Sequence, residues 1–282
     1  MSQDILTLEL RASDFEKICA MLKSLCGIKL YAGKEHLVKA RLMKRLKALN
    51  FNNFSEYLKY LENDDSGSEL ALMVDLLTTN KTNFFREIQH FDYLRDEVLP
   101  VWSPSRLRIW SAGCSTGEEP YSLAILLLEE LEDIKGRDIR ILATDISGRV
   151  LEKAKRGEYE YECVKNMPKN LIDQYFQCVD TTGQQVYRVN KNVSNFITLA
   201  RLNLMNSWPM RGPFDIIFCR NVMIYFEKET RERLVQRFWD MLKPGGYLFV
   251  GHSESLAALS HTFKYRKPAV YMKQELVTEQ AI

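Results

Sequence analysis

The 282-residue sequence has no long run of apolar residues, no cysteine pair in CxxC spacing and only four scattered histidines. The first absence argues against a membrane-spanning helix, which needs about 20 consecutive apolar residues. The other two leave no recognisable metal-binding pattern, so we expect no metal. The six cysteines lie partly inside apolar runs such as "FCRNV" and are expected to be reduced thiols of a cytoplasmic protein. The opening "MSQDILTLEL" carries Asp4 and Glu9 without a basic segment, so we do not expect a secretory signal.

The composition also lacks a strong excess of charge of one sign. The net charge is +2, with 46% hydrophobic and 27% charged residues, which is ordinary for a globular protein. The length allows one large domain or two unequal ones. We predict a helical domain over 1–77, an interdomain segment over 78–90 and a second domain over 91–282, with an insertion at about 160–195.

The first domain is predicted from helical periodicity. Ser13 with Glu16 and Asn53 with Glu56 have the spacing of capping boxes, each followed by apolar residues at helical intervals. Another helix is predicted over 34–49, and a fourth is predicted to begin near Ser66 and to run through "LALMVDLL".

Strands and helices alternate in the second domain. The strand candidates are "LRIW", "IRILATD", "FITLA", "FDIIFCR" and "GYLFVGH", and helices are predicted over 119–132, 147–156 and 229–242. This alternation predicts an α/β fold with a parallel sheet covered on both faces. The insertion is predicted to hold short strands around a turn, and the tail "HTFKYRKPAVYMKQ" a final hairpin.

The ends of the predicted strands indicate the ligand. Doubly wound sheets bind ligands at the carboxyl ends of their strands. Asp145 ends the second strand and can accept hydrogen bonds from both ribose hydroxyls, although it could instead cap the next helix, a role that Ser147 could also fill. The glycine loop "SAGCSTGEEP" has no third glycine and carries Glu118 and Glu119, which would repel a pyrophosphate. A ligand with a ribose, no phosphate and a positive charge fits better, and S-adenosylmethionine has these properties.

Two readings of the loop carboxylates remain open at this point. Glu119 could face the cationic end of the cofactor or a ribose hydroxyl. Alternatively, Glu118 and Glu119 are first-turn carboxylates that favour the helix dipole.

Several motifs together resemble the chemotaxis receptor methyltransferases, the CheR family. They are "TTNKTNFFRE", "STGEEPYS", "ATDIS", "RNVMIYF", "LKPGGYLFVGHSE" and the basic helix "KARLMKRLKAL", in order over residues 10–274. The resemblance implies a Rossmann-like S-adenosylmethionine-dependent methyltransferase sheet with a small all-helical N-terminal domain and a small β-subdomain. It also implies a cytoplasmic protein-glutamate O-methyltransferase that is recruited to receptor arrays.

The resemblance further implies site residues by matching positions. The cofactor contacts would be Asn80, Thr82, Arg86, Gly113, Glu119, Asp145, Asn203, Leu204, Asn221 and Val222. The candidate catalytic residues are Arg86 and Tyr225. Arg86 could orient a carboxylate of the cofactor or the substrate, and Tyr225 is either a wall of the active site or a core residue. The substrate glutamate is already ionised at neutral pH, so no general base is required.

Substrate recognition is expected to rest on the basic helix. Lys34, Arg41, Lys44 and Arg45 share one face of it, which is either a docking surface for the acidic methylation region of receptor coiled coils or simply a solvated face. Some family members also bind a receptor C-terminal pentapeptide through an Arg-Gly-x-Gly turn in the β-subdomain. The matching stretch, "FQCVDTTGQQVYRV", lacks that turn, so we expect no pentapeptide tether. No nucleic acid partner and no membrane insertion are expected.

Functions of other classes fit the same residues less well. An RNA or DNA methyltransferase would use the same cofactor, but the Asn/Asp-Pro-Pro-aromatic turn of many such enzymes is absent where "RNVMIY" stands. A non-catalytic signalling adaptor would be indicated by a degenerate cofactor loop. A nicotinamide dehydrogenase is disfavoured by the loop carboxylates.

Overall fold

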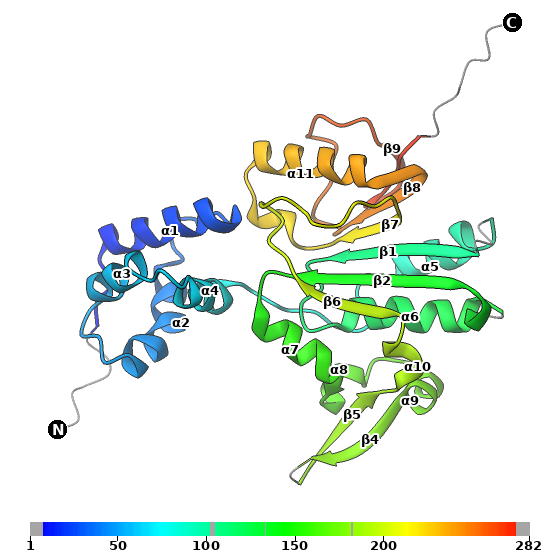
Figure 1. Cartoon of the computed structure of the whole chain (residues 1–282), viewed down its shortest axis with the longest axis horizontal. Helices are drawn as coiled ribbons and strands as arrows, with labels where there is room; N and C mark the ends of the chain where they lie inside the picture. Colours follow the sequence, from blue (N-terminus) through cyan, green and yellow to red (C-terminus); the bar gives the residue numbers. More distant parts are fainter. Residues whose placement is uncertain (1–7, 102–104, 133, 182, 275–282) are drawn as a thin grey trace, which may run out of the picture. The chain divides into compact units, whose positions relative to one another are not determined.

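Two units make up the chain in the computed structural model, which describes residues 8–101, 105–132, 134–181 and 183–274 (Figure 1). The helical unit comprises Met1–Thr79 with Tyr225–Glu227, and the sheet unit comprises Asn80–Ile224 with Lys228–Ile282. The expectation about a secretory signal falls mostly on residues 1–7, outside the described ranges. No helix in the described ranges is both long enough and apolar enough to cross a membrane.

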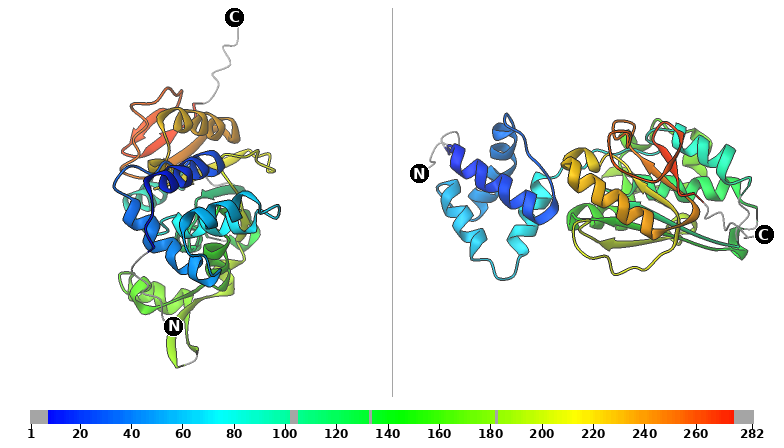
Figure 2. Two further views of the ribbon diagram at one scale, coloured as in Figure 1. Left: turned by 90° about the vertical axis from the view of Figure 1, so that its left-hand side faces the viewer. Right: turned by 90° about the horizontal axis from the view of Figure 1, so that it is seen from above.

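The helical unit contains four helices that pack on one another (Figure 2): α1 Ala12–Cys26, α2 Glu35–Ala48, α3 Phe54–Glu62 and α4 Ser68–Leu77. Helix α2 shows why. Val38, Leu42 and Leu46 recur every four residues and are fully buried, because this spacing places them on one face of a helix. The predicted all-helical N-terminal domain is therefore confirmed.

The helix starts agree only partly with the predicted capping boxes. Asn53 caps α3, since its Oδ1 accepts a hydrogen bond from the backbone N–H of Glu56 at 2.9 Å. The box at Ser13 is wrong: α1 already begins at Ala12, and Ser13 and Glu16 are both exposed. A Ser-x-x-Glu pattern with two solvent-facing side chains also fits inside a helix, so the pattern alone does not place the first residue.

Seven strands form the main sheet of the sheet unit, in the order β6-β2-β1-β7-β8-β10-β9. Their bounds are β1 Arg106–Ala112, β2 Asp138–Asp145, β6 Ile197–Arg201, β7 Phe214–Cys219, β8 Leu242–Val250, β9 Lys264–Lys267 and β10 Val270–Met272. The first five strands are parallel to one another, and β10 pairs antiparallel with β8 and β9. The predicted strands and the final hairpin are confirmed.

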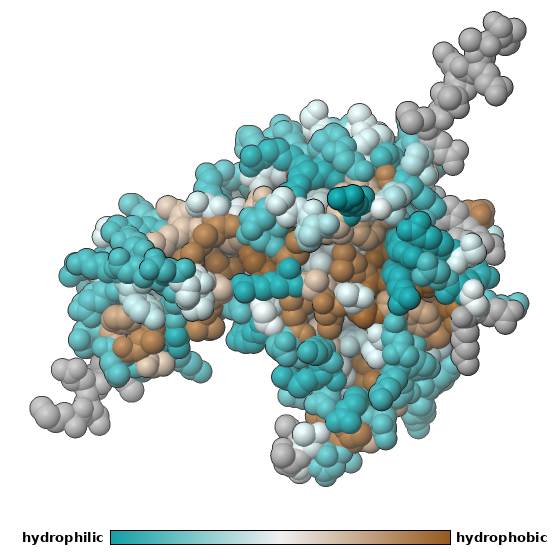
Figure 3. Space-filling model, in the orientation of Figure 1, coloured by the Kyte–Doolittle hydropathy of each residue, from teal (hydrophilic) through white to brown (hydrophobic). Residues whose placement is uncertain are grey.

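Helices accompany the parallel strands as the alternation predicted. The predicted ones are α6 Glu118–Glu130, α7 Gly148–Arg156 and α11 Lys228–Met241, and α5 Gln89–Tyr93 is a further short helix that the sequence did not predict. A π-helical turn, Leu94–Val98, continues α5. Figure 3 shows mainly hydrophilic residues over α11, whereas every residue of β7 is buried. A strand with no exposed residue is expected at the centre of a sheet covered on both faces.

The insertion is a small second sheet with the order β3-β5-β4, built from β3 Glu158–Tyr159, β4 Phe176–Thr181 and β5 Gln184–Val189. Three short helices flank it: α8 Tyr161–Val164, α9 Lys169–Tyr175 and α10 Lys191–Ser194. Figure 1 shows the β4–β5 hairpin projecting away from the main sheet. The predicted strands around a turn are confirmed, but the three helices were not predicted because each is seven residues or shorter.

Candidate functional site

The candidate site lies at the carboxyl ends of the parallel strands. Strand β1 has β2 on one side and β7 on the other, so the strand order reverses at β1. In open α/β sheets a ligand binds in the crevice at such a reversal. The segments after β1, β2, β6 and β7 all carry residues that the sequence predicted as cofactor contacts.

The glycine loop after β1 approaches the segment after β7 very closely. Gly113 has a φ of +89°, and its N–H donates to the carbonyl of Thr144 at 2.8 Å. A Cβ atom at this position would lie only 2.4 Å from Cγ2 of Val222. Val222 therefore fills the space that a side chain at residue 113 would need, and the two predicted contacts depend on each other.

Asp145 connects the end of β2 to the glycine loop. Its Oδ2 accepts from the N–H of Ser115 and its Oδ1 from the N–H of Ser147, both at 2.9 Å. The helix-capping role belongs to Ser147, whose hydroxyl accepts from the N–H of Val150 at the start of α7. Asp145 thus lies where the glycine loop and the start of α7 meet, which is the position from which the ribose contact was predicted.

The two loop carboxylates have different surroundings. Glu118 is buried and accepts from the hydroxyl of Thr116 at 2.6 Å. Glu119 accepts from the hydroxyl of Ser111 at 2.7 Å and pairs with Arg220 at 3.1 Å. Burial raises the pKa of both carboxyl groups, although the charge of Arg220 opposes this effect at Glu119.

A buried ion group joins this loop to two further segments, and the sequence analysis missed it. The side chain of Arg220 is 2% exposed and lies between Glu119 and Glu87, with Nη2 3.2 Å from Oε2 of Glu87. Its Nη2 also donates to the carbonyl of Arg86. We call Arg220, Glu87 and Glu119 the ion group. The available signal was an arginine directly after the apolar run "IIFC", in "IIFCRNV".

Glu254 is a second carboxylate that the sequence analysis did not select. It is 2% exposed and accepts from the backbone N–H groups of Asn221 at 2.6 Å, Gly251 at 2.7 Å and Ile224 at 3.0 Å. Burial raises the pKa of this carboxyl group, and the N–H donors oppose the rise. Glu254 thus fixes the turn after β7, where Asn221 has a φ of +59°.

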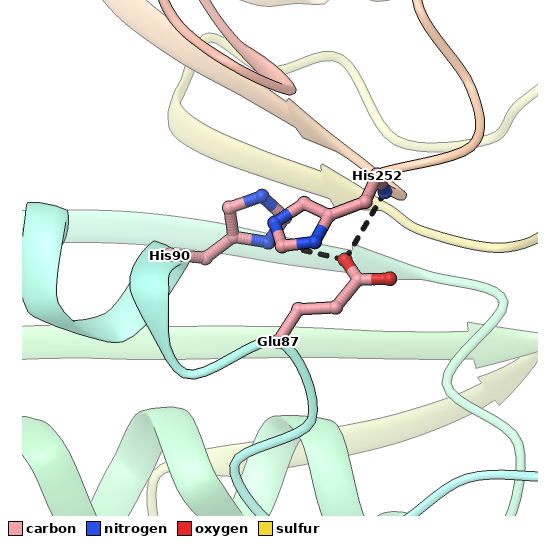
Figure 4. A group of neighbouring side chains, drawn as sticks. All are labelled: Glu87, His90 and His252. Carbon is pink, nitrogen blue, oxygen red and sulfur yellow. Dashed lines mark hydrogen bonds and ion pairs between the residues drawn. The ribbon is translucent and has the colours of Figure 1, made fainter.

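Two histidines that are distant from each other in the sequence, His90 and His252, lie beside Glu87 (Figure 4). The nearest nitrogen and oxygen atoms of Glu87, His90 and His252 are all within 4.8 Å of one another. Burial lowers the pKa of His90 to about 3, so its ring is neutral. A cation at Glu87 would compete with Arg220, with the side-chain amide of Asn221 and with the backbone N–H of His252, which already bond its two oxygens. Glu87 is therefore held by a guanidinium, an amide and a backbone N–H.

Other predicted cofactor contacts also belong to the sheet unit. The carbonyl of Asn80 accepts from the hydroxyl of Ser115 at 3.0 Å, which brings the 80–87 segment to the glycine loop. Thr82 is half-buried, and Arg86 donates to the carbonyl of Lys81 at 2.8 Å. After β6, Asn203 accepts from the N–H of Met205, and the buried Leu204 accepts from Arg237 through its carbonyl.

Tyr225 belongs to the helical unit. Its carbonyl accepts from the N–H of Lys29 at 2.8 Å, and nearby Glu227 pairs with Lys23 and Lys29. The side chain of Tyr225 is half-buried.

The four predicted substrate-binding cations of α2 and its start divide into two kinds. Arg41 donates to the carbonyls of Leu77 and Thr78, and Arg45 bonds Glu69, which is 4% exposed. Lys34 and Lys44 are exposed. The two arginines therefore have partners inside the helical unit, which the helical wheel could not reveal.

The contact between Gly113 and Val222 leads to a first prediction. Gly113→Ala should weaken binding of S-adenosylhomocysteine by about tenfold or more, because the new methyl group displaces Val222. Calorimetry measures this affinity. Because Val222 is itself a proposed cofactor contact, Val222→Ala should weaken binding in the parent and have a smaller effect in Gly113→Ala, where the clash is relieved.

Gly33→Ala is the matched control for this substitution. Gly33 has a φ of +91°, and a Cβ there meets nothing within 4 Å, so it carries the same backbone strain without the clash. Equal effects of the two alanine substitutions on affinity would contradict the prediction.

Comparison with known proteins agrees with this geometry. A family model described as "CheR methyltransferase, SAM binding domain" matches residues 80–272, and one described as "CheR methyltransferase, all-alpha domain" matches residues 13–78. The chain is 40% identical to a chemotaxis protein methyltransferase of Klebsiella aerogenes, covering 94% of this chain and 90% of that protein. It is 39% identical to the Escherichia coli chemotaxis protein methyltransferase, covering 94% of this chain and 92% of that protein. It is 38% identical to the Borreliella burgdorferi chemotaxis protein methyltransferase, covering 95% of this chain and 96% of that protein. The predicted family, methyltransferase fold and cofactor are confirmed: the chain belongs to the CheR methyltransferase family, with an S-adenosylmethionine-binding domain over residues 80–272.

Proposed function

We propose that the chain transfers a methyl group from S-adenosylmethionine to glutamate side chains of chemotaxis receptors, forming methyl esters during sensory adaptation. The observation that carries this proposal is the 38–40% identity to chemotaxis protein methyltransferases over at least 94% of the chain. The enzyme would act in the cytoplasm at receptor arrays. No observation favours the nucleic-acid methyltransferase or the adaptor.

The chemistry requires little from the protein in the way of proton transfer. A glutamate side chain has an ordinary pKa of about 4.3 and is therefore a carboxylate nucleophile at neutral pH. Its attack on the sulfonium methyl group cancels charge in the transition state, and water stabilises the separated charges better than the transition state. Excluding water and aligning the carboxylate oxygen with the methyl–sulfur bond are thus the main tasks of the site.

The ion group supports binding of a cationic cofactor. Within it, the carboxylates of Glu87 and Glu119 share the one guanidinium of Arg220. A sulfonium or ammonium group nearby would complete the charge balance of a buried site, where an uncompensated carboxylate is costly. Glu118 is not part of the ion group, because it is buried with the hydroxyl of Thr116 as its donor.

Arg86 and Tyr225 remain the proposed catalytic residues. The guanidinium of Arg86 uses one of its five N–H donors on the carbonyl of Lys81. Its planar fork suits a carboxylate, which supports a role in orienting either the substrate or the cofactor. Tyr225 would line the substrate position as a wall residue.

Methyl transfer to glutamate can be tested by the stability of the product. The enzyme, tritium-methyl-labelled cofactor and receptor-containing membranes should give labelled receptor, and mild alkali should release the label as methanol because carboxylic esters hydrolyse there. Label that stays on the receptor in alkali would contradict glutamate specificity. Label that instead enters added RNA or DNA would contradict the choice of substrate.

Binding of the cofactor ribose by Asp145 gives a second prediction. Asp145→Ala should weaken S-adenosylhomocysteine binding by about 1.5–3 kcal/mol, because a charged acceptor is lost. It should also lower stability, since Ser115 and Ser147 lose their acceptor. Ser147→Ala is the control: it removes the cap of α7, at a cost of about 1 kcal/mol in stability, and should leave affinity unchanged. A folded Asp145→Ala protein with parental affinity would exclude the ribose contact.

Docking on an acidic receptor region gives a third prediction. It concerns Lys34 and Lys44, the two predicted substrate-binding cations that are exposed. Lys34→Glu with Lys44→Glu should raise the KM for receptor several-fold and leave cofactor affinity unchanged, because the reversed charges repel an acidic partner. Lys17→Glu with Lys59→Glu, also exposed in the helical unit, is the control for total charge. Arginine reversals are unsuitable here, because Arg45→Glu would remove the cationic partner of the buried Glu69. Equal receptor KM values for the two double variants would indicate that the lysines are merely solvated.

Independence from a pentapeptide tether gives a fourth prediction. In the β-subdomain, Arg188 pairs with Glu158 at 2.6 Å, and Asp180 accepts from the N–H of Gly183 in the β4–β5 turn. The cation that could meet an acidic peptide thus has an acidic partner already. Calorimetric titration with the receptor C-terminal pentapeptide should show no micromolar binding. Micromolar binding that disappears in Arg188→Ala would show that a tether site exists.

A further inference from the structure

The side chain of Arg220 bonds more parts of the sheet unit than its place at a strand end requires. Its Nε and Nη2 lie 3.4 and 3.2 Å from Oε2 of Glu87, its Nη1 lies 3.1 Å from Oε2 of Glu119, and its Nη2 also reaches the carbonyl of Arg86. The rings of Phe91 and Phe218 flank it, with centroids 5.8 and 6.0 Å from Cζ. One guanidinium therefore joins the 86–87 segment, the start of α6 and the end of β7.

Each of the three joined segments carries a proposed cofactor contact directly beside the bond to Arg220. The carbonyl of Arg86 accepts from the guanidinium, Glu119 pairs with it, and Asn221 is its neighbour in the chain. From this arrangement we propose that Arg220 is a positioning residue, which holds these three segments at the spacing that S-adenosylmethionine needs. The inference depends on the cofactor contacts proposed above.

The backbone beside Arg220 supports this role. Phe85, Glu87 and Asn221 have φ values of +51°, +55° and +59°, a conformation that residues with a Cβ adopt rarely. Such residues persist only where the surroundings hold them, and they concentrate at functional sites. Here Arg220 bonds the carbonyl and carboxylate of residues 86 and 87, and Glu254 bonds the N–H of Asn221. The segments are thus held in shapes that they would not adopt alone.

Calorimetric binding of S-adenosylhomocysteine tests the role without any receptor. Arg220→Gln should raise the Kd by about 30-fold or more, because it unlinks the segments and leaves two carboxylates facing each other. Arg220→Lys keeps the charge but cannot reach all three segments, so its Kd should rise by about tenfold. In methyl transfer assays, the KM for S-adenosylmethionine should rise while the KM for receptor stays unchanged.

Arg108→Gln is the matched control. The guanidinium of Arg108 also donates to two carbonyls, those of Leu107 and Asp138, and to the carboxylate of Asp138. These bonds lie at the amino ends of β1 and β2, away from the candidate site. Its loss should lower stability and change the Kd less than threefold. A double-mutant cycle adds a second readout: Glu87→Gln should weaken binding in the parent and have little further effect in Arg220→Gln.

A folded Arg220→Gln protein whose Kd for S-adenosylhomocysteine is within threefold of the parental value would overturn the proposal and leave Arg220 a stabilising residue only. If Arg220→Gln does not fold, Arg220→Lys decides: a Kd within threefold of the parent overturns the proposal, and a tenfold rise supports it. Because this test measures cofactor binding alone, a failure here is distinct from a failure to methylate receptors.

Discussion

The charge of one buried guanidinium is the constraint on which the site depends. Arg220 is at the end of a strand whose six residues are all buried, and it could not remain there without compensation. Glu87 and Glu119 provide that compensation from segments 133 and 101 residues away along the chain. Burial alone would raise the pKa of Glu87, but Arg220 and the amide and N–H donors outweigh burial and lower it, so this carboxylate stays ionised. These ion pairs thus hold the 86–87 segment and the start of α6 at the end of β7, where the cofactor is expected.

Close packing makes a second contribution to the same edge. Val222 lies against the α-carbon of Gly113, and Tyr159 of the small sheet donates its hydroxyl to the carbonyl of Thr116 in the glycine loop. The loop is therefore held by Val222 after β7, by Asp145 after β2 and by Tyr159 of the insertion. Within the loop, Ser115 has a φ of +50°, which costs a residue with a Cβ roughly 1–3 kcal/mol and persists because these contacts over-determine the backbone.

The sequence predicted what depends on local pattern and on parallel topology. Apolar runs located the strands, and parallel pairing then required Gly113, Asp145 and Asn221 to meet at one edge, as they do. The ion group and Glu254 escaped prediction because each depends on partners far away in the chain. An arginine after an apolar strand has the same local pattern whether it faces solvent or two carboxylates. The wrong prediction of a capping box at Ser13 has a different cause. Its Ser-x-x-Glu pattern is local, but the same pattern also occurs inside helices, as it does in α1.

The basic helix α2 is a further case in which the sequence pattern did not reveal the partners of the side chains. Helical periodicity grouped Lys34, Arg41, Lys44 and Arg45 on one face, yet only the arginines bond inside the helical unit. The fork of an arginine can bond carbonyls and carboxylates together, which a lysine ammonium does less well. Arg41, Arg45, Arg108, Arg220 and Arg237 all use their guanidinium groups in this internal way. In α2 and at its start, arginines thus hold the fold while Lys34 and Lys44 stay exposed, so the charge available to an acidic partner is that of the lysines.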